Sequence, residues 1–82
     1  MISRVLLLAG TAEARRLARV LAHRQGLRVV SSLAGRVRTP NLPAGEVRLG
    51  GFGGADSLVR WLRTERVDVL VDATHPFAAA IT

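Results

Sequence analysis

Short apolar runs recur along the chain and indicate buried strands. Residues 4–9 are mostly valine and leucine, and Gly10 bounds them. A continuous run of this kind is typical of a parallel strand that is buried on both faces. Three further strands are predicted at residues 27–33, 46–49 and 67–73.

Two of the intervening segments have the apolar spacing of amphipathic helices. After Thr11, which is a suitable N-cap, apolar residues recur at i, i+3, i+4 and i+7, and Gly26 is a suitable stop. This apolar stripe consists of Ala14, Leu17, Ala18 and Leu21. The second helix is predicted at residues 56–66, and its core-facing residues are Leu58, Trp61 and Leu62.

The order of these elements predicts an α/β fold with a Rossmann-like parallel sheet. Pro40 and Pro43 exclude a regular helix between the second and third strands, so that connection is expected to be a loop. Pro76 fits the first position of a further helix, which runs to the end of the sequence. We therefore expect residues 1–82 to be at most one domain, which is truncated inside this last helix.

Composition narrows the class of protein. The net charge is +6, and twelve arginines and no lysine provide the positive charge, which favours an anionic partner such as nucleic acid, a phosphorylated cofactor or a polycarboxylate. Cysteine is absent, which excludes disulfides and cysteine metal sites. No apolar run approaches the roughly 20 residues of a membrane span, and we expect a cytoplasmic chain.

The turn from Gly10 to Glu13 is the first candidate site. It joins the first strand to the first helix, where free peptide N–H groups and the helix dipole favour an anion such as phosphate. The turn lacks the three-glycine spacing of the usual dinucleotide fingerprint, and the Glu13 carboxylate would compete with a phosphate. The alternative is a helix cap with an acidic first turn.

The end of the second strand is the second candidate. No carboxylate occurs between Glu13 and Glu46, although a carboxylate after this strand is what normally binds the ribose 2′-hydroxyl of NAD. Ser31 and Ser32 stand there instead, and Arg36 and Arg38 follow them. These groups suit a 2′-phosphate and favour NADP over NAD, with a solvated basic loop as the alternative.

Two later segments also carry candidate chemistry. Four glycines around Phe52, in residues 50–54, allow close approach to a ligand that the ring would cover, or else form a flexible connector with Phe52 in the core. His75 follows the fourth strand, where ligands bind in open α/β sheets. It is either an acid–base residue that Asp72 orients or a structural capping residue. Metal binding is not expected, because His23 lies apart on the first helix.

Four segments in series, residues 8–15, 32–36, 45–54 and 72–78, resemble the N-terminal part of the precorrin-6A reductases of cobalamin biosynthesis. The resemblance implies an NADP-dependent oxidoreductase acting on a CH–CH bond. It would transfer a hydride from NADPH to the macrocycle of precorrin-6A, or of its cobalt-containing counterpart, and yield the 6B product. Members of that family are longer and carry a second domain. The resemblance therefore implies that residues 1–82 are the N-terminal half of a nucleotide-binding domain, Rossmann-like and specific for NADPH, and that this chain alone is inactive.

The resemblance also implies roles for individual residues. The cofactor-binding residues carried over are Gly10, Thr11, Ala12, Glu13, Ser32, Arg36, Gly51, Phe52, Thr74 and His75. Residues 10–13 would line the pyrophosphate and ribose through backbone groups, and Ser32 and Arg36 would contact the 2′-phosphate. Gly51 and Phe52 would lie along the adenosine half. Thr74 and His75 would lie near the nicotinamide ribose and the substrate edge. Apart from the resemblance, His75 is the candidate proton donor to the substrate, because histidine titrates near neutral pH. Ala9 departs from a glycine in many relatives, which affects the tightness of the first turn.

Two alternatives from other classes stay open. One is a non-catalytic nucleic-acid-binding or regulatory module, which the arginines favour but which the few aromatic residues, Phe52, Trp61 and Phe77, support poorly. The other is a different nucleotide-dependent Rossmann-like enzyme. The expected partner is a small tetrapyrrole, with no nucleic acid and no membrane, and the sequence does not indicate the oligomeric state.

Overall fold

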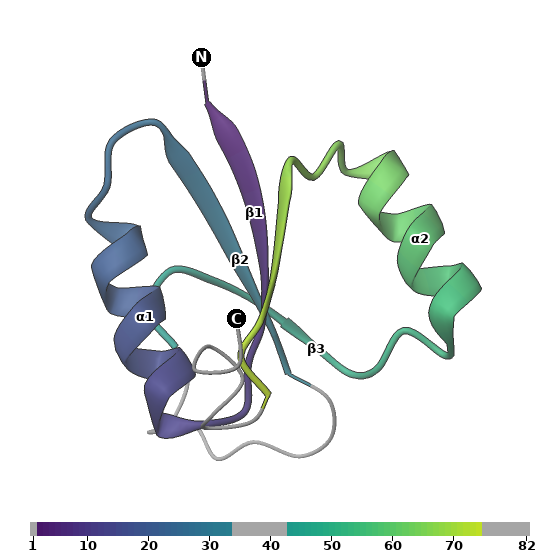
Figure 1. Ribbon diagram of the computed structural model, residues 1–82, viewed down its shortest axis with the longest axis horizontal. Coiled ribbons are helices and arrows are strands. Elements are labelled where there is room, and N and C mark those ends of the chain that lie inside the picture. Colours follow the sequence, from purple (N-terminus) through teal and green to yellow (C-terminus); the bar gives the residue numbers. More distant parts are fainter. Residues whose placement is uncertain (1, 34–42, 75–82) are drawn as a thin grey trace.

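The computed structural model describes residues 2–33 and 43–74, and within them it forms a parallel sheet with two helices. The elements in chain order are β1 (Ser3–Leu8), α1 (Ala12–Ala22), β2 (Leu27–Leu33), β3 (Glu46–Leu49), α2 (Ala55–Thr64) and β4 (Val69–Asp72). The strands pair in parallel in the order β3-β2-β1-β4. The two helices lie on opposite sides of the sheet (Figure 1). The predicted Rossmann-like α/β fold is confirmed.

The strand order places the topological switch point beside β1. The chain steps outward from β1 through β2 to β3, and β4 then returns to the other side of β1. In open α/β sheets, ligands bind in the crevice at the carboxyl ends of the strands where the order reverses. A ligand site is therefore expected at the carboxyl ends of β1 and β4.

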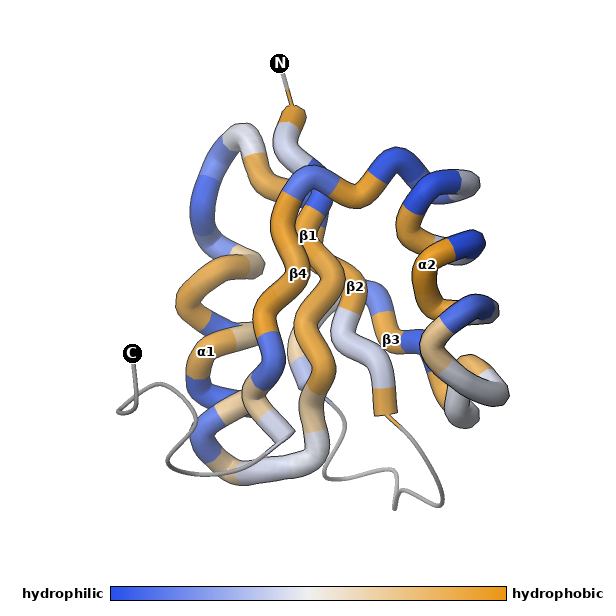
Figure 2. Tube along the Cα trace, turned by 45° about the vertical axis from the view of Figure 1, so that its right-hand side comes forward, coloured by the Kyte–Doolittle hydropathy of each residue, from blue (hydrophilic) through white to orange (hydrophobic). Residues whose placement is uncertain are grey.

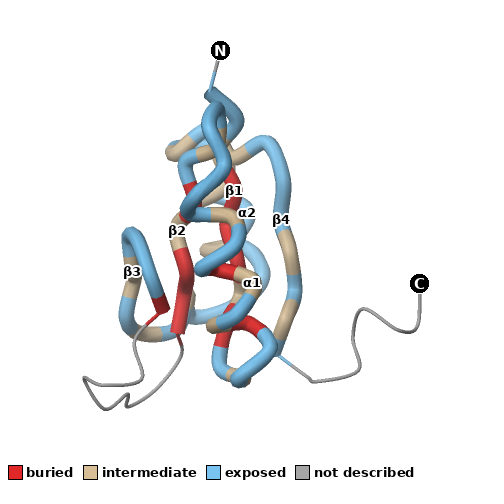
Figure 3. The backbone as a smooth tube through the Cα atoms, turned by 90° about the vertical axis from the view of Figure 1, so that its left-hand side faces the viewer, coloured by how far each residue is buried: buried red, intermediate tan, exposed pale blue. Residues whose placement is uncertain are grey.

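The core lies between the sheet and α1. Alternate residues of β1 and β2 meet the small residues of α1, and the buried members are Val5, Leu7, Ala9, Ala14, Ala18, Val29 and Leu33. Leu6, on the other face of β1, is also completely buried. Buried residues concentrate along β1 and β2 (Figure 3), as expected for strands that are covered on both faces.

Both predicted helices end earlier than the sequence indicated. Helix α1 ends at Ala22 with His23 as its C-cap, and Gly26, with φ of +83°, lies in the turn that follows. Helix α2 ends at Thr64, and the Val67 N–H closes it by donating to the Leu62 carbonyl at 2.9 Å. Because Val67 completes this cap, β4 starts at Val69 and not at Val67.

Helix α2 and the edge strand β4 are covered less completely than α1 and the central strands. Helix α2 has no buried residue, and its predicted core residues Leu58, Trp61 and Leu62 are only half-buried. On the edge strand β4, Val69 is 47% exposed and Leu70 is 44% exposed. The apolar stretch along β4 is visible in Figure 2. Among the described residues, this side of the fold is therefore covered incompletely.

Some predictions fall on other parts of the chain. Most of the proline-containing loop, and the helix predicted to begin at Pro76, lie outside the described residues. Within residues 2–33 and 43–74, no helix has the length and apolar character needed to cross a bilayer.

Candidate functional site

A cavity of about 220 Å³ opens at the carboxyl ends of the strands. Its lining comes from all four strand ends and consists of Leu8, Ala9, Ser32, Gly50, Gly51, Phe52 and Thr74. The structure thus brings together four residues that the sequence singled out separately: Ser32, Gly51, Phe52 and Thr74. Because β1 and β4 are neighbours, this cavity lies at the switch point of the sheet.

Two lining residues, Leu8 and Ala9, were not predicted to contact a ligand, and Gly50 was predicted only as part of the glycine-rich segment. Leu8 is the last residue of β1, Ala9 directly follows it, and Gly50 directly follows β3. Ala9 is buried, and its N–H donates to the Ser32 carbonyl at 2.9 Å, which fixes the end of β1 against β2. Only their position in the sequence could have identified these residues, because each lies at the end of a predicted parallel strand or directly follows one.

Thr11 connects the start of α1 to the end of β4. Its hydroxyl accepts a hydrogen bond from the Ala14 N–H at 3.0 Å, which confirms the predicted N-cap. The same hydroxyl donates to the Ala73 carbonyl at 3.0 Å. Because the hydroxyl proton is used in the bond to Ala73, the Thr11 side chain has no donor left for a ligand and only one remaining lone pair.

The first turn of α1 retains peptide donors. The N–H groups of Ala12 and Glu13 have no acceptor within the helix, because the first turn of any helix lacks one. Gly10 turns the chain into this helix with φ of +146°, which favours glycine. The residues from Gly10 to Glu13 do not line the cavity, but the bond from Thr11 to Ala73 brings them next to Thr74, which does.

The Glu13 carboxylate has a partner on the surface of α1. Its Oε1 lies 3.4 Å from Nη2 of Arg16, and both side chains are exposed. An exposed pair of this kind is weak, yet the arginine places positive charge beside the acidic first turn. Arg16 therefore offsets part of the repulsion that Glu13 would exert on a bound phosphate.

The two serines at the end of β2 have different surroundings. Ser31 is completely buried, and within the described residues its Oγ has no hydrogen-bond partner. Ser32 is 5% exposed and lines the cavity. Alternation along a strand sends neighbouring side chains to opposite faces, so Ser32 is the serine that faces the site. Arg36, which was predicted to act with Ser32, lies outside the described residues.

Phe52 combines the two interpretations left open by the sequence. It lines the cavity, and it also packs edge-on against Trp61 with ring centroids 5.6 Å apart. The guanidinium of Arg48 lies over the same ring, 3.7 Å from its centroid. Phe52 is therefore both a wall of the site and an anchor for the glycine-rich loop.

At the end of β4, Asp72 fixes the conformation of Thr74. One carboxylate oxygen, Oδ1, accepts from the Thr74 hydroxyl at 2.7 Å and from its N–H at 3.1 Å. This local turn holds Thr74 at the cavity. His75, the predicted proton donor, lies outside the described residues. Among those that are described, no group of three His, Cys, Asp or Glu side chains has the arrangement of a metal site.

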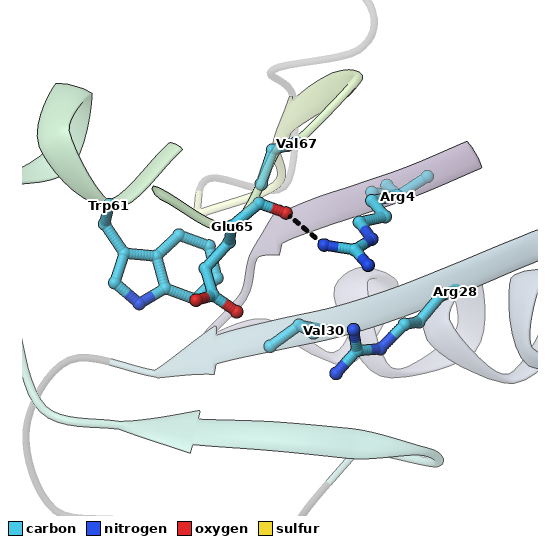
Figure 4. A pocket seen from close by; sticks show the side chains of 7 residues that line it. Arg4, Arg28, Val30, Trp61, Glu65 and Val67 are labelled. Atoms are coloured by element: carbon cyan, nitrogen blue, oxygen red, sulfur yellow. Dashed lines mark hydrogen bonds between the residues drawn. The ribbon is translucent and has the colours of Figure 1, made fainter. Parts of the chain in front are cut away.

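A second, much smaller cavity lies between α2 and the amino-terminal half of the sheet (Figure 4). Its volume is about 10 Å³, which holds at most one water molecule. Arg4 borders it and donates from Nη1 to the Glu65 carbonyl at 2.7 Å. This cavity is a packing gap at the end of the sheet opposite the candidate site.

Strands β2 and β3 are joined near that end by an exposed ion pair. Arg28 donates to the Glu46 carboxylate from Nε at 2.8 Å and from Nη2 at 3.0 Å. The hydrogen bonds and charge of Arg28 lower the pKa of Glu46, and the same contact raises the pKa of Arg28. The pair supports the sheet and does not belong to the candidate site.

Comparison with known proteins gives consistent matches. The family described as "Precorrin-6x reductase CbiJ/CobK" matches residues 4–82. The precorrin-6A reductases of Rhodococcus erythropolis and Mycobacterium tuberculosis are 62% and 61% identical to the chain over 80 residues. Each alignment covers 98% of this chain and 32% of the relative, so the chain spans about a third of the length of these relatives.

A solved structure agrees with the sequence matches. It is described as "CobK precorrin-6A reductase", is 49% identical and superposes with a TM-score of 0.81. The match covers 98% of this chain and 32% of that one. The family match across nearly the whole chain, together with the shared fold, shows that the chain belongs to the precorrin-6x reductase (CbiJ/CobK) family.

Proposed function

We propose that this chain forms part of the NADPH site of a precorrin-6A reductase of cobalamin biosynthesis. The observation that carries the proposal is the strand-end cavity, which Ser32, Gly51, Phe52 and Thr74 line together. Its place at the switch point is where Rossmann-like folds bind dinucleotides. The curated relatives are named for the reduction of precorrin-6A, and we extend that activity to the protein that contains this chain.

The lining of the cavity suits NADPH better than NADH. No carboxylate is among the lining residues in the described part of the chain, and the Ser32 hydroxyl stands at the end of β2. A carboxylate there would bind the ribose diol of NAD and repel the 2′-phosphate of NADP. Ser32 and Arg36 would bind that phosphate, and Gly51 and Phe52 would contact the adenosine half.

The remaining residues would serve the reactive half of the cofactor. When bound, NADPH supplies the hydride that saturates one double bond of the macrocycle. The free N–H groups of Ala12 and Glu13 would bind the pyrophosphate at the start of α1. Thr74 and His75 would lie beside the nicotinamide ribose, and His75 would deliver the proton that the reduced macrocycle needs.

The nucleic-acid alternative has less support. Two of the three aromatic side chains, Phe52 and Trp61, pack against each other and not as open stacking platforms. Proteins that bind single strands usually present such rings to the bases. A cytoplasmic location with only small-molecule partners is part of the same proposal.

Thermal unfolding of the chain with each cofactor tests the proposal. A ligand that binds the native state raises the midpoint, so NADPH should raise it more than NADH at equal concentration. Ser32→Ala should reduce the preference for NADPH, while Ser57→Ala on α2 serves as the control. Equal shifts by the two cofactors would contradict the assignment of the 2′-phosphate, and the absence of any shift would contradict cofactor binding by this chain.

A further inference from the structure

Arg48 on β3 stands next to the cavity without lining it. It is the register partner of Ser32 on β2, and side chains at paired positions of neighbouring parallel strands leave the sheet on the same face. Arg48 is half-buried. A cation in this position would be expected to contact an anionic ligand, but the Arg48 side chain contacts the glycine-rich loop and two aromatic rings.

The guanidinium of Arg48 donates to the backbone of the glycine-rich loop. Its Nη1 lies 2.7 Å from the Gly50 carbonyl oxygen, and its Nη2 lies 3.4 Å from the Gly51 carbonyl oxygen. Hydrogen bonds from a charged donor are stronger than neutral ones. Gly50 has φ of +96° and no side chain of its own, so restraint of this loop has to come from outside it.

The same guanidinium also lies against two aromatic rings. Its Cζ is 3.7 Å from the centroid of Phe52 and 5.8 Å from that of Trp61. Such contacts are favourable because the ring faces carry negative charge density. Arg48 thereby ties together β3, the loop and α2.

These contacts determine which way two peptide groups face. In a trans peptide the N–H points opposite to the C=O, and the described residues contain no cis peptide bond. Because the Gly50 and Gly51 carbonyls face Arg48, the N–H groups of Gly51 and Phe52 face away from it. Neither N–H has a backbone acceptor among the described residues, and both residues line the cavity.

We infer that Arg48 is a positioning residue of the cofactor site, which orients the Gly51 and Phe52 peptide N–H groups as donors to the ligand. The inference rests on the proposed function, because the ligand is taken to be NADPH. Arg48 acts through the loop and does not itself contact the cofactor. This distinguishes it from Ser32 and Arg36, which are proposed to bind the cofactor phosphate directly.

Three variants of the chain test this role. Arg48→Met removes the hydrogen bonds and the charge but keeps much of the apolar stem. Arg48→Lys keeps the charge, but its compact ammonium cannot replace the planar fork of the guanidinium. Arg60→Met is the matched control, because Arg60 is an exposed arginine on α2. The cooperativity of unfolding checks that each variant is folded.

Two measurements on these variants test the positioning role of Arg48. Backbone ¹⁵N relaxation without cofactor gives the order parameters of Gly51 and Phe52, which should fall from about 0.85 to below about 0.6 in Arg48→Met. An NMR titration with NADPH should then show affinity weakened about tenfold in Arg48→Met, or about 1.4 kcal/mol. Arg48→Lys should show a smaller loss, and Arg60→Met should match the wild type in both.

The other outcomes overturn the inference in distinguishable ways. Unchanged order parameters with weakened NADPH binding in Arg48→Met would mean that Arg48 contacts the cofactor directly. Unchanged NADPH binding in Arg48→Met would remove the positioning role and leave the proposed function standing. If the wild-type chain bound no NADPH, the proposed function would fail for this chain, whatever the order parameters showed.

Discussion

Thr11 shows how much one small side chain contributes to this fold. Its hydroxyl caps α1 through Ala14 and also donates to the Ala73 carbonyl beyond β4. The capping role follows from sequence, because threonine before an amphipathic segment is a known start signal. The bond to Ala73 was not predictable, since it depends on β4 pairing beside β1.

Replacing Thr11 separates the hydroxyl from the shape of the side chain. Thr11→Val should lower the free energy of unfolding by about 1–2 kcal/mol, because it removes the cap and leaves the Ala73 carbonyl without this donor. Thr11→Ser keeps both hydrogen bonds and should cost much less. Urea unfolding of the two variants measures the difference, and equal losses would show that the hydroxyl is not what matters.

Among the described residues, Arg66 is the one residue other than glycine that has a positive φ, which is 53°. It follows the C-cap of α2, a position that favours glycine because a Cβ is strained there. Arg66→Gly should therefore raise the stability by about 0.5–1 kcal/mol, after the greater freedom of glycine in the unfolded chain is counted. Arg66→Ala keeps the strain and is the control. If alanine stabilised the chain as much as glycine, the gain would come from the lost charge.

At the scale of elements, hydrophobic periodicity located every helix and strand that the structure describes. The ends were less predictable, because local caps decide them: His23 ends α1 before Gly26, and Val67 closes α2 and delays β4. The candidate site was predictable in outline, since Ser32 lies at the end of β2 and Thr74 lies just after β4. The position of Arg48 was not, because its hydrogen bonds to the loop exist only once β3 and the loop are in place.

The pairing of β2 with β3 should depend on pH through Glu46. Arg28 lowers the pKa of Glu46 in the folded chain, so the ionised glutamate favours folding. This stabilisation is present above the ordinary pKa of an unfolded glutamate and is lost as pH falls through the lowered folded value. It should be small, because the pair is exposed.

Glu46→Gln provides the comparison. The difference in urea midpoint between the wild type and Glu46→Gln should be present at neutral pH and should shrink toward zero in acid. Added salt should reduce the difference at neutral pH as well. A difference that stayed constant with pH would show that the pair does not stabilise the sheet.

At the scale of the whole molecule, the two faces of the sheet are unequal. Most of the buried residues lie between α1 and the sheet, whereas α2 buries none of its own residues and Leu70, which lies on the α2 face of β4, is exposed. Composition and the order of elements do not predict which face is the weaker one, because that depends on how closely each helix packs.

Two leucines on the same face of neighbouring strands test the difference in burial between the central strand β1 and the edge strand β4. Leu6 is completely buried, and its register partner Leu70 is 44% exposed. Leu6→Ala should cost about 2–5 kcal/mol of stability, as large-to-small changes in a core do. Leu70→Ala should cost less than half as much in the same denaturant titration. Equal losses would mean that β4 is packed as tightly as β1 in solution.

The central claim is that NADPH binds at the carboxyl ends of the four strands. Mapping amide chemical shifts of the ¹⁵N-labelled chain during an NADPH titration tests it most directly. We expect the largest changes at Ala9, Ser32, Gly51, Phe52 and Thr74, with little change at Arg4, Arg28 and Glu46 near the opposite end of the sheet. Changes confined to that opposite end, or none at saturating NADPH, would contradict the claim.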